Sequence, residues 1–310
     1  MAVPFQDILV QVDTAWKDQP ALDRAVALAR SDGARLHLMA VVAEAPEPAR
    51  ALLSDEIRQR LVQRPQDELA RIRAGLEARG LDVTADVRRG RPAIALIRDV
   101  LAHGHDLVMR SHGTGANDGK RYGPVDMQLL RQCPCPVWLV RTPDGRPLKR
   151  VLATVDPAAG DPAHDELNLK VLELAGGIAR AEGAALFVLH AWAPFGADLL
   201  RSYMKPAELR GYVEAVRRMA RDAFADLLAR AGDRLPDAQS LLVRGDAGWI
   251  IPRVARTKRV DLVVMGTVAR TRISGLLIGN TAERALQGLR CSVLAIKPRT
   301  FVSPVEGREE

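Results

Sequence analysis

The chain carries the same pattern of residues twice, and this internal duplication constrains its fold more than any other feature. An apolar segment at residues 8–12 and another at 151–155 are each followed directly by an aspartate. The residues that match in order are Asp13 with Asp156, Asp106 with Asp261, and Cys135 with Cys291. Their separations are all roughly 150 residues, the ordinary size of one domain, so the sequence predicts a duplicated domain rather than a short repeat.

Length and composition agree with two domains. The chain has 310 residues, of which 47% are hydrophobic, enough for two ordinary cores. We place the domains at residues 1–143 and 148–300, joined by a linker rich in proline and glycine at 141–149. The net charge of +7 is scattered among acidic residues. This pattern favours a solvated surface over a nucleic-acid footprint.

The sequence predicts a cytoplasmic protein. Its three cysteines give no disulfide framework. No basic region followed by an apolar run begins the chain, so no signal peptide is expected. No apolar stretch approaches the ~18 residues of a membrane span.

Apolar strands alternate with amphipathic helices in both halves. Strands are expected at 8–12, 36–42, 83–87, 107–109 and 137–140, and at 151–155, 186–191, 240–243, 262–265 and 293–296. Helices are expected from a cap at Asp18 to Gly33, at 54–79 with a kink at Pro65, at 91–101, 126–131, 165–181, 206–231, 249–256 and 281–289. The fold class is therefore α/β: two tandem Rossmann-like domains, each a five-stranded parallel sheet flanked by helices.

Ligands of such sheets bind at the carboxyl ends of the strands, where strand order reverses. In the second half, Gly266 follows a strand and Gly279 precedes a helix that begins at Asn280 or Thr281. Free amides at that helix start would suit a phosphate. In the alternative interpretation, Asn280 and Glu283 form a capping box and Gly279 only permits a turn. The glycines alone leave both interpretations open.

This segment resembles the universal stress protein family. The similarity lies in Met265-Gly-Thr-Val and Ile278-Gly-Asn-Thr-Ala-Glu, followed by Leu289-Arg-Cys and Ile296-Lys-Pro. Weaker matches are Asp18-Gln-Pro-Ala-Leu and His105-Asp-Leu-Val. Two copies in one chain resemble the tandem members, and the motifs are similar to those of the universal stress protein E subgroup. The resemblance covers essentially the whole chain.

The resemblance implies ATP, or a related adenine nucleotide, as the ligand of the second domain. The motif of ATP-binding members is glycine, two residues, glycine, nine residues, then glycine followed by serine or threonine. Here Ala269 replaces the second glycine and Asn280 replaces the hydroxyl residue, although Thr281 follows. The family contacts adenine or ribose at the position of Asp156. The implied binding residues are Val155, Asp156, Met265, Gly266, Ala269, Arg270, Arg272, Gly279, Asn280 and Thr281.

The first domain departs further from the motif. Ser111 replaces the first glycine, and Gly123 is followed by Pro124, which has no N–H to offer a phosphate. We interpret this domain as a degenerate copy without a nucleotide. The resemblance also implies that the last strands, 138–140 and 294–296, lie against each other and make an intrachain pseudo-dimer. A homodimer and protein partners are compatible with the sequence, which identifies neither.

Several histidines are candidate metal ligands. His103 and His105 lie close in sequence, with His112 nearby, but only Cys133 and Cys135 add soft ligands. Zinc needs about four converging ligands, so we favour structural histidines and core thiols and expect no metal site. For His190, at the end of an apolar strand, we favour a structural role over lining the cleft.

No enzyme mechanism is apparent. The sequence contains no G-x-S-x-G elbow, no Walker loop and no G-x-G-x-x-G fingerprint after either first strand. We expect a stress-response protein that senses a ligand and contacts other proteins. The alternatives are a slow ATPase using the same cleft and a module for another anionic or apolar ligand.

Overall fold

A computed structural model describes residues 5–14, 16, 18–44, 47–112, 122–141, 146–157, 162–235, 237–267 and 279–306. The strands are β1 (Asp7–Gln11), β2 (Arg35–Val42), β3 (Val83–Arg89), β4 (Leu107–Ser111), β5 (Val137–Val140), β6 (Arg150–Val155), β7 (Ala185–Trp192), β8 (Gln239–Arg244), β9 (Leu262–Gly266) and β10 (Ser292–Ile296). The α-helices are α1 (Pro20–Asp32), α2 (Glu47–Leu52), α3 (Asp55–Glu77), α4 (Pro92–His103), α5 (Pro124–Gln132), α6 (Pro162–Glu182), α7 (Ala197–Leu200), α8 (Pro206–Ala231), α9 (Ala247–Thr257) and α10 (Asn280–Gly288).

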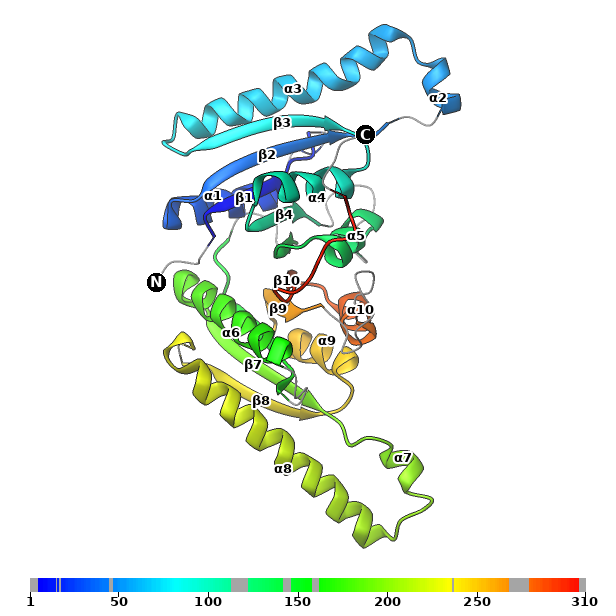
Figure 1. Ribbon diagram of the computed structural model, residues 1–310. Coiled ribbons are helices and arrows are strands. Elements are labelled where there is room, and N and C mark those ends of the chain that lie inside the picture. Colours follow the sequence, from blue (N-terminus) through cyan, green and yellow to red (C-terminus); the bar gives the residue numbers. More distant parts are fainter. Residues whose placement is uncertain are drawn as a thin grey trace.

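The ten strands form one sheet in the order β3-β2-β1-β4-β5-β10-β9-β6-β7-β8. Each half is a parallel five-stranded sheet, as predicted. The halves join where β5 pairs with β10 in antiparallel orientation, with Trp138 opposite Leu294. Figure 1 shows the two halves arranged about this junction, with the long helices α3 and α8 at opposite ends. The intrachain pairing implied by the family resemblance is therefore present.

Helices cover both faces of the sheet. One buried cluster packs side chains of α1, α3, α6 and α8 against the first face, and it runs through both halves. A second cluster packs α4, α5, α9 and α10 against the opposite face. Because both faces are covered, the central strands are apolar on both sides, which explains the near-continuous apolar runs in the sequence.

The repeated aspartate before the fourth strand of each half has a structural role. Asp106 accepts hydrogen bonds from the backbone N–H groups of Gln6 (2.7 Å) and Asp7 (3.2 Å), at the start of β1. Asp261 accepts the equivalent bonds from Lys149 and Arg150, both at 2.8 Å, at the start of β6. These bonds satisfy backbone amides at the start of β1 and of β6.

The helix boundaries agree with the sequence prediction, with several differences. The cap predicted at Asp18 is wrong: Gln19 precedes α1 and makes no side-chain cap, while Gly33 ends the helix at φ 70° as expected. Helix α3 continues through Pro65. The short helices α2 and α7 were not predicted, because neither is long enough to show helical periodicity. Among the described residues, no helix is both long enough and apolar enough to cross a membrane.

Candidate ligand cleft of the second domain

The candidate ligand site lies where strand order reverses in the second half. From β6 the chain passes to β7 and β8 on one side, whereas β9 and β10 lie on the other. Adjacent strands β6 and β9 are parallel, with Thr154 opposite Met265. Their carboxyl ends therefore place Val155 and Asp156 beside Gly266, which is the position where open α/β sheets bind ligands.

The end of β9 is tied to the start of α10. The backbone N–H of Gly279 donates to the carbonyl of Thr267 (3.2 Å), and the N–H of Thr267 donates to Ile296 on β10. Gly266 has a packing role as well, because a Cβ there would lie 2.7 Å from Cδ2 of Leu167 on α6. Glycine therefore lets α6 approach the strand end closely.

Helix α10 begins at Asn280, and the residue before it is Gly279, which makes no side-chain cap. The capping box considered for Asn280 and Glu283 is therefore wrong: Asn280 occupies the first helical position, and Glu283 pairs with Arg131 of the first domain at 2.8 Å. Both Asn280 and Thr281 are exposed. The helix start thus presents amides that no capping side chain occupies, at the positive end of the helix dipole.

Asp156 lies in a turn held by a residue that the sequence did not single out. Its backbone N–H donates to Oδ1 of Asn168 (3.0 Å), and Nδ2 of Asn168 donates back to the Asp156 carbonyl (3.0 Å). Asn168 is buried on α6. His190 is also buried and contacts the carbonyl of Val155 through Nδ1 at 3.3 Å, which fits the structural role favoured for it.

A partly buried lysine follows β10 and contacts the end of β9. Lys297 donates from Nζ to Oγ1 of Thr267 (3.1 Å) and to the carbonyl of Leu130 in the first domain. Burial lowers the pKa of Lys297 to about 8, because the charged ammonium loses hydration. Neither Thr267 nor Lys297 was among the predicted site residues. Both stand immediately after a strand, β9 or β10, and both belong to segments that carry the family resemblance.

In the first domain, a carboxylate of the chain itself lies at the start of α5, the helix that corresponds to α10. Asp126, in the first turn of α5, is buried and accepts hydrogen bonds from three donors. The donors are Nε of Arg110 (2.7 Å), Nδ1 of His112 (2.7 Å) and the N–H of Gly123 (3.0 Å). Burial disfavours the charged carboxylate, but His112 and Arg110 outweigh it, so the pKa of Asp126 is lowered. In α10 the same helical position is Ala282.

Other substitutions also distinguish the first domain. Ser111, which stands where the second domain has Gly266, accepts a hydrogen bond through Oγ from the N–H of Ala21 at 3.0 Å, at the start of α1. Pro124 begins α5, two residues before the predicted start of this helix. The interpretation of this domain as a degenerate copy therefore gains a physical reason. Internal polar groups thus fill the start of α5 and the end of β4 in this domain.

Some predicted binding residues lie outside the described residues. These are Ala269, Arg270 and Arg272. The structure brings Val155, Asp156, Met265 and Gly266 together at adjacent strand ends, and joins Gly279 to them through Thr267. Met265 and Val155 are largely buried beneath the cleft.

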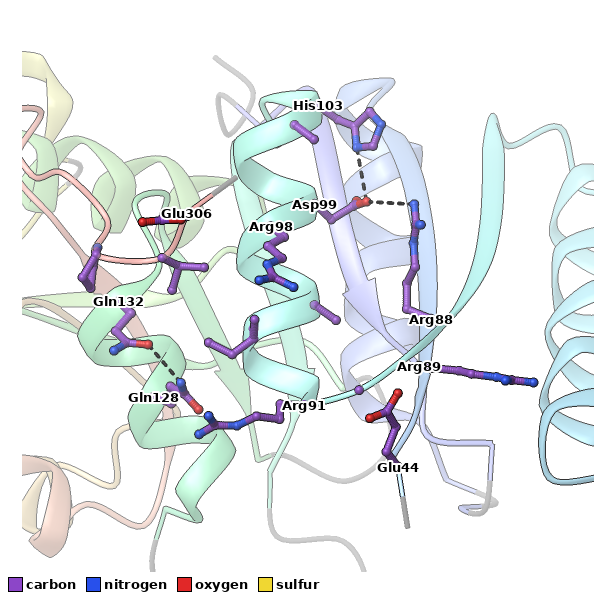
Figure 2. Close-up of a pocket in the computed structure, with 16 residues that line it drawn as sticks. Glu44, Arg88, Arg89, Arg91, Arg98, Asp99, His103, Gln128, Gln132 and Glu306 are labelled. Carbon is purple, nitrogen blue, oxygen red and sulfur yellow. Dashed lines mark hydrogen bonds and ion pairs between the residues drawn. The ribbon is translucent and has the colours of Figure 1, made fainter. Parts of the chain in front are cut away.

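A cavity of about 1170 Å³ lies elsewhere, in the first domain. Figure 2 shows its lining along α4, with arginines from β3 and α4 and glutamines from α5. The C-terminal residues 304–306 also line it, although they follow the last strand of the second domain. This cavity is separate from the cleft at the carboxyl ends of β6 and β9.

Comparison with known proteins decides the family. The profile of the universal stress protein family matches residues 4–141 and 147–297, one match for each half. The chain belongs to the universal stress protein family. It is 29% identical over 320 residues to universal stress protein E of Escherichia coli K12, covering 99% of this chain and 98% of the relative. The Salmonella typhi protein of the same name is 30% identical over 317 residues, covering 99% and 98%.

Solved structures agree with this fold along nearly the whole chain. A protein from Pseudomonas aeruginosa PAO1, described as functionally unknown, is 28% identical with a TM-score of 0.71 and covers 96% of this chain and 94% of its own. A universal stress protein from Archaeoglobus fulgidus covers 94% and 96% with a TM-score of 0.64. Its 15% identity supports the fold alone. Two universal stress protein domains in tandem therefore make up this chain.

Proposed function

We propose that the second domain binds an adenine nucleotide, with ATP as the leading ligand, and that this binding lets the protein act in a stress response through contacts with other proteins. The relatives of similar length are named universal stress proteins, which supports the stress-response part of the proposal. Asp156 would face the adenosine, and the amides at Asn280 and Thr281 would hold phosphate, with Gly279 keeping its bond to Thr267. Arg270 and Arg272 would add charge-assisted contacts.

One observation supports this proposal: the two domains differ in the residues at the start of the equivalent helices α5 and α10. In α5, Asp126 supplies an internal anion to Arg110, His112 and the N–H of Gly123. In α10, Ala282 supplies none, and Gly279 offers no capping side chain. Because a helix start favours negative charge, the second domain can take its anion from a ligand.

The test moves the carboxylate of the first domain into the second. ATP binding is measured by calorimetry on the full chain and on the variant Ala282→Asp. The carboxylate at the third helical position would occupy the amides and repel phosphate, so we expect at least tenfold weaker binding, about 1.4 kcal/mol. The matched control is Gln287→Glu, which adds the same charge at the exposed far end of α10.

The proposal fails if the folded wild-type chain binds no ATP, or if Ala282→Asp binds as well as Gln287→Glu. Release of ADP by the wild-type chain would instead identify a slow ATPase. Displacement of ATP by an unrelated anion of equal affinity would point to a general anion site. Glu283, the acidic residue in the first turn of α10, is already paired with Arg131, which argues against its use as a general base for turnover.

A further inference from the structure

A cluster of three histidines and one carboxylate lies in the first domain. It is at the opposite edge of the sheet from the carboxyl strand ends, which correspond to the candidate ligand site of the second domain. His37 comes from β2, Asp99 and His103 from α4, and His105 from the turn before β4. The ligand atoms of Asp99, His103 and His105 all lie within 4.8 Å of one another. Asp99 lies one helical turn before His103 but was not among the candidate ligands expected from the sequence, and His37 comes from a distant segment.

The carboxylate of Asp99 is the centre of the cluster. Its Oδ2 lies 2.8 Å from Nε2 of His105 and 3.6 Å from Nε2 of His37, and its Oδ1 lies 3.2 Å from Nδ1 of His103. In a tetrahedral zinc site with bonds of about 2.0–2.1 Å, neighbouring ligand atoms are about 3.4 Å apart. The three distances bracket that separation. Asp99, His103 and His105 are therefore close enough to share one ion, and His37 stands beside Asp99 as a fourth candidate ligand.

Two histidines are oriented by bonds on their other nitrogen. Nδ1 of His105 pairs with Oδ1 of Asp7 at 2.5 Å, and Nδ1 of His37 pairs with the hydroxyl of Thr84 at 2.7 Å. Each bond leaves Nε2 directed at Asp99. A carboxylate behind a ligating histidine is the usual outer shell of a zinc site, because it fixes the ring and raises its basicity.

A purely structural role does not account for His37. Its Nε2 is buried and has no hydrogen-bond partner, which is an unfavourable state for a polar atom. Its ring stacks on that of His105, with centroids 5.4 Å apart. A metal ion beside Asp99 would satisfy this nitrogen and join the two rings without an extra proton. His105, by contrast, is satisfied on both nitrogens by carboxylates.

The cluster is also accessible. The His103 side chain is 57% exposed, and His103 and Asp99 line the cavity of the first domain. Figure 2 shows both side chains at one end of that cavity, with Arg88 directed at the same carboxylate. Arg88 lies 4.0 Å from Asp99 but only 2.7 Å from Asp86, so a second carboxylate partly neutralises its charge.

We propose that His37, Asp99, His103 and His105 form a binding site for a divalent zinc-type cation in the first domain. Three imidazole nitrogens with one carboxylate oxygen suit Zn²⁺ better than Mg²⁺ or Ca²⁺, which prefer oxygen ligands. Binding displaces any proton held between the histidines and Asp99, and the cation takes its place. The site lies apart from the proposed nucleotide cleft, so the two proposals stand independently.

The test uses the full chain without an affinity tag, freed of metal with a chelator. Zn²⁺ is titrated in competition with a chromophoric chelator, and bound zinc is counted by elemental analysis after gel filtration. We expect one zinc ion per chain, and at least about tenfold weaker binding in His37→Gln and in His103→Gln. His103 is exposed, so its variant should fold normally, and circular dichroism checks this.

The matched control is His164→Gln, which removes a histidine from α6 in the second domain and should leave zinc affinity unchanged. Co²⁺ in place of Zn²⁺ should give the visible absorption of a tetrahedral site, and this absorption should be lost in His103→Gln. The proposal is overturned if the wild type retains less than half an equivalent of zinc. It is equally overturned if both cluster variants bind like the control, or if binding depends on Cys133 and Cys135 instead.

Discussion

Replacing Asp126 with alanine tests whether the internal carboxylate of the first domain stabilises the folded chain. Asp126 is 3% exposed and is the common acceptor for Arg110, His112 and the N–H of Gly123. The change Asp126→Ala leaves a partly buried guanidinium and a buried imidazole without their carboxylate. Alanine is the natural residue at the equivalent position, Ala282, so the backbone tolerates it.

The expected loss of unfolding free energy depends on how well the donors Arg110 and His112 are solvated once the carboxylate is removed. Removing one partner of a buried ion pair costs about 3–5 kcal/mol, because the remaining charge stays buried. The Arg110 side chain is 17% exposed and also contacts Oε1 of Gln11, so it keeps part of its solvation and one partner. We therefore expect a loss at the lower end, about 3 kcal/mol of unfolding free energy.

The loss should depend on pH in a defined direction. The pKa of Asp126 is lowered in the folded chain, so the folded state binds the proton less readily than the unfolded state. Its stabilisation is fully present above the unfolded pKa, about 3.9, and is lost as pH falls through the lower folded pKa. The difference between wild type and variant should stay constant from pH 7 to about 5 and shrink below about 4.

Urea unfolding followed by circular dichroism measures both quantities. The control is Asp222→Ala on α8, where an exposed aspartate pairs with the adjacent Arg221 at 3.1 Å. That pair should contribute less than about 1 kcal/mol. The reasoning is refuted if Asp126→Ala costs no more than this control. It is also refuted if the difference between wild type and variant grows, rather than shrinks, in acid.

Two further predictions concern the sheet junction and a helix contact. Leu294 in β10 is fully buried, so Leu294→Ala should lower the unfolding free energy by about 2–5 kcal/mol and keep a single urea transition. The control Leu199→Ala changes an exposed side chain and should lower it little. Two separate transitions would mean that the halves unfold independently. Gly288→Ala should destabilise by about 1–3 kcal/mol, because the new Cβ would lie 2.8 Å from the rigid ring of Pro252. In the control Gly75→Ala on α3, the new Cβ meets no atom within 4 Å, so this variant should be more stable by about 0.5–1 kcal/mol. If thermal unfolding shows the same effect for Gly288→Ala and Gly75→Ala, the packing argument is contradicted.

The architecture of each half could be predicted from the sequence. Strands covered on both faces are apolar throughout, and this pattern marked β1, β4, β6, β9 and β10. Gly33 ended α1 as expected because a left-handed residue stops a helix there. The error at Asp18 was local. An acidic residue before a proline suggested a cap, but Gln19 precedes the helix and neither side chain caps it.

The candidate cleft was predictable in position more than in detail. Gly266 and Gly279 identified the loop, because a glycine at a strand end or before a helix indicates a tight turn or a close approach of the backbone. The turn held by Asn168 and the contact of Lys297 with Thr267 were missed, since each joins residues that are not neighbours in sequence. The meaning of Ala282 became apparent only beside Asp126, after the two helix starts could be compared.

The sequence by itself determined the duplication and the alternation of strands and helices, and it predicted the edge of each sheet where a ligand would bind. These properties follow from local periodicity and from the order of elements, both of which are written along the chain. Only the tertiary structure decided which polar groups meet. It put Asp126 into the anion position of the first domain and gathered His37, Asp99, His103 and His105 from three segments. The physical reason is that side-chain chemistry acts over a few ångströms, a distance that spacing along a folded chain does not specify.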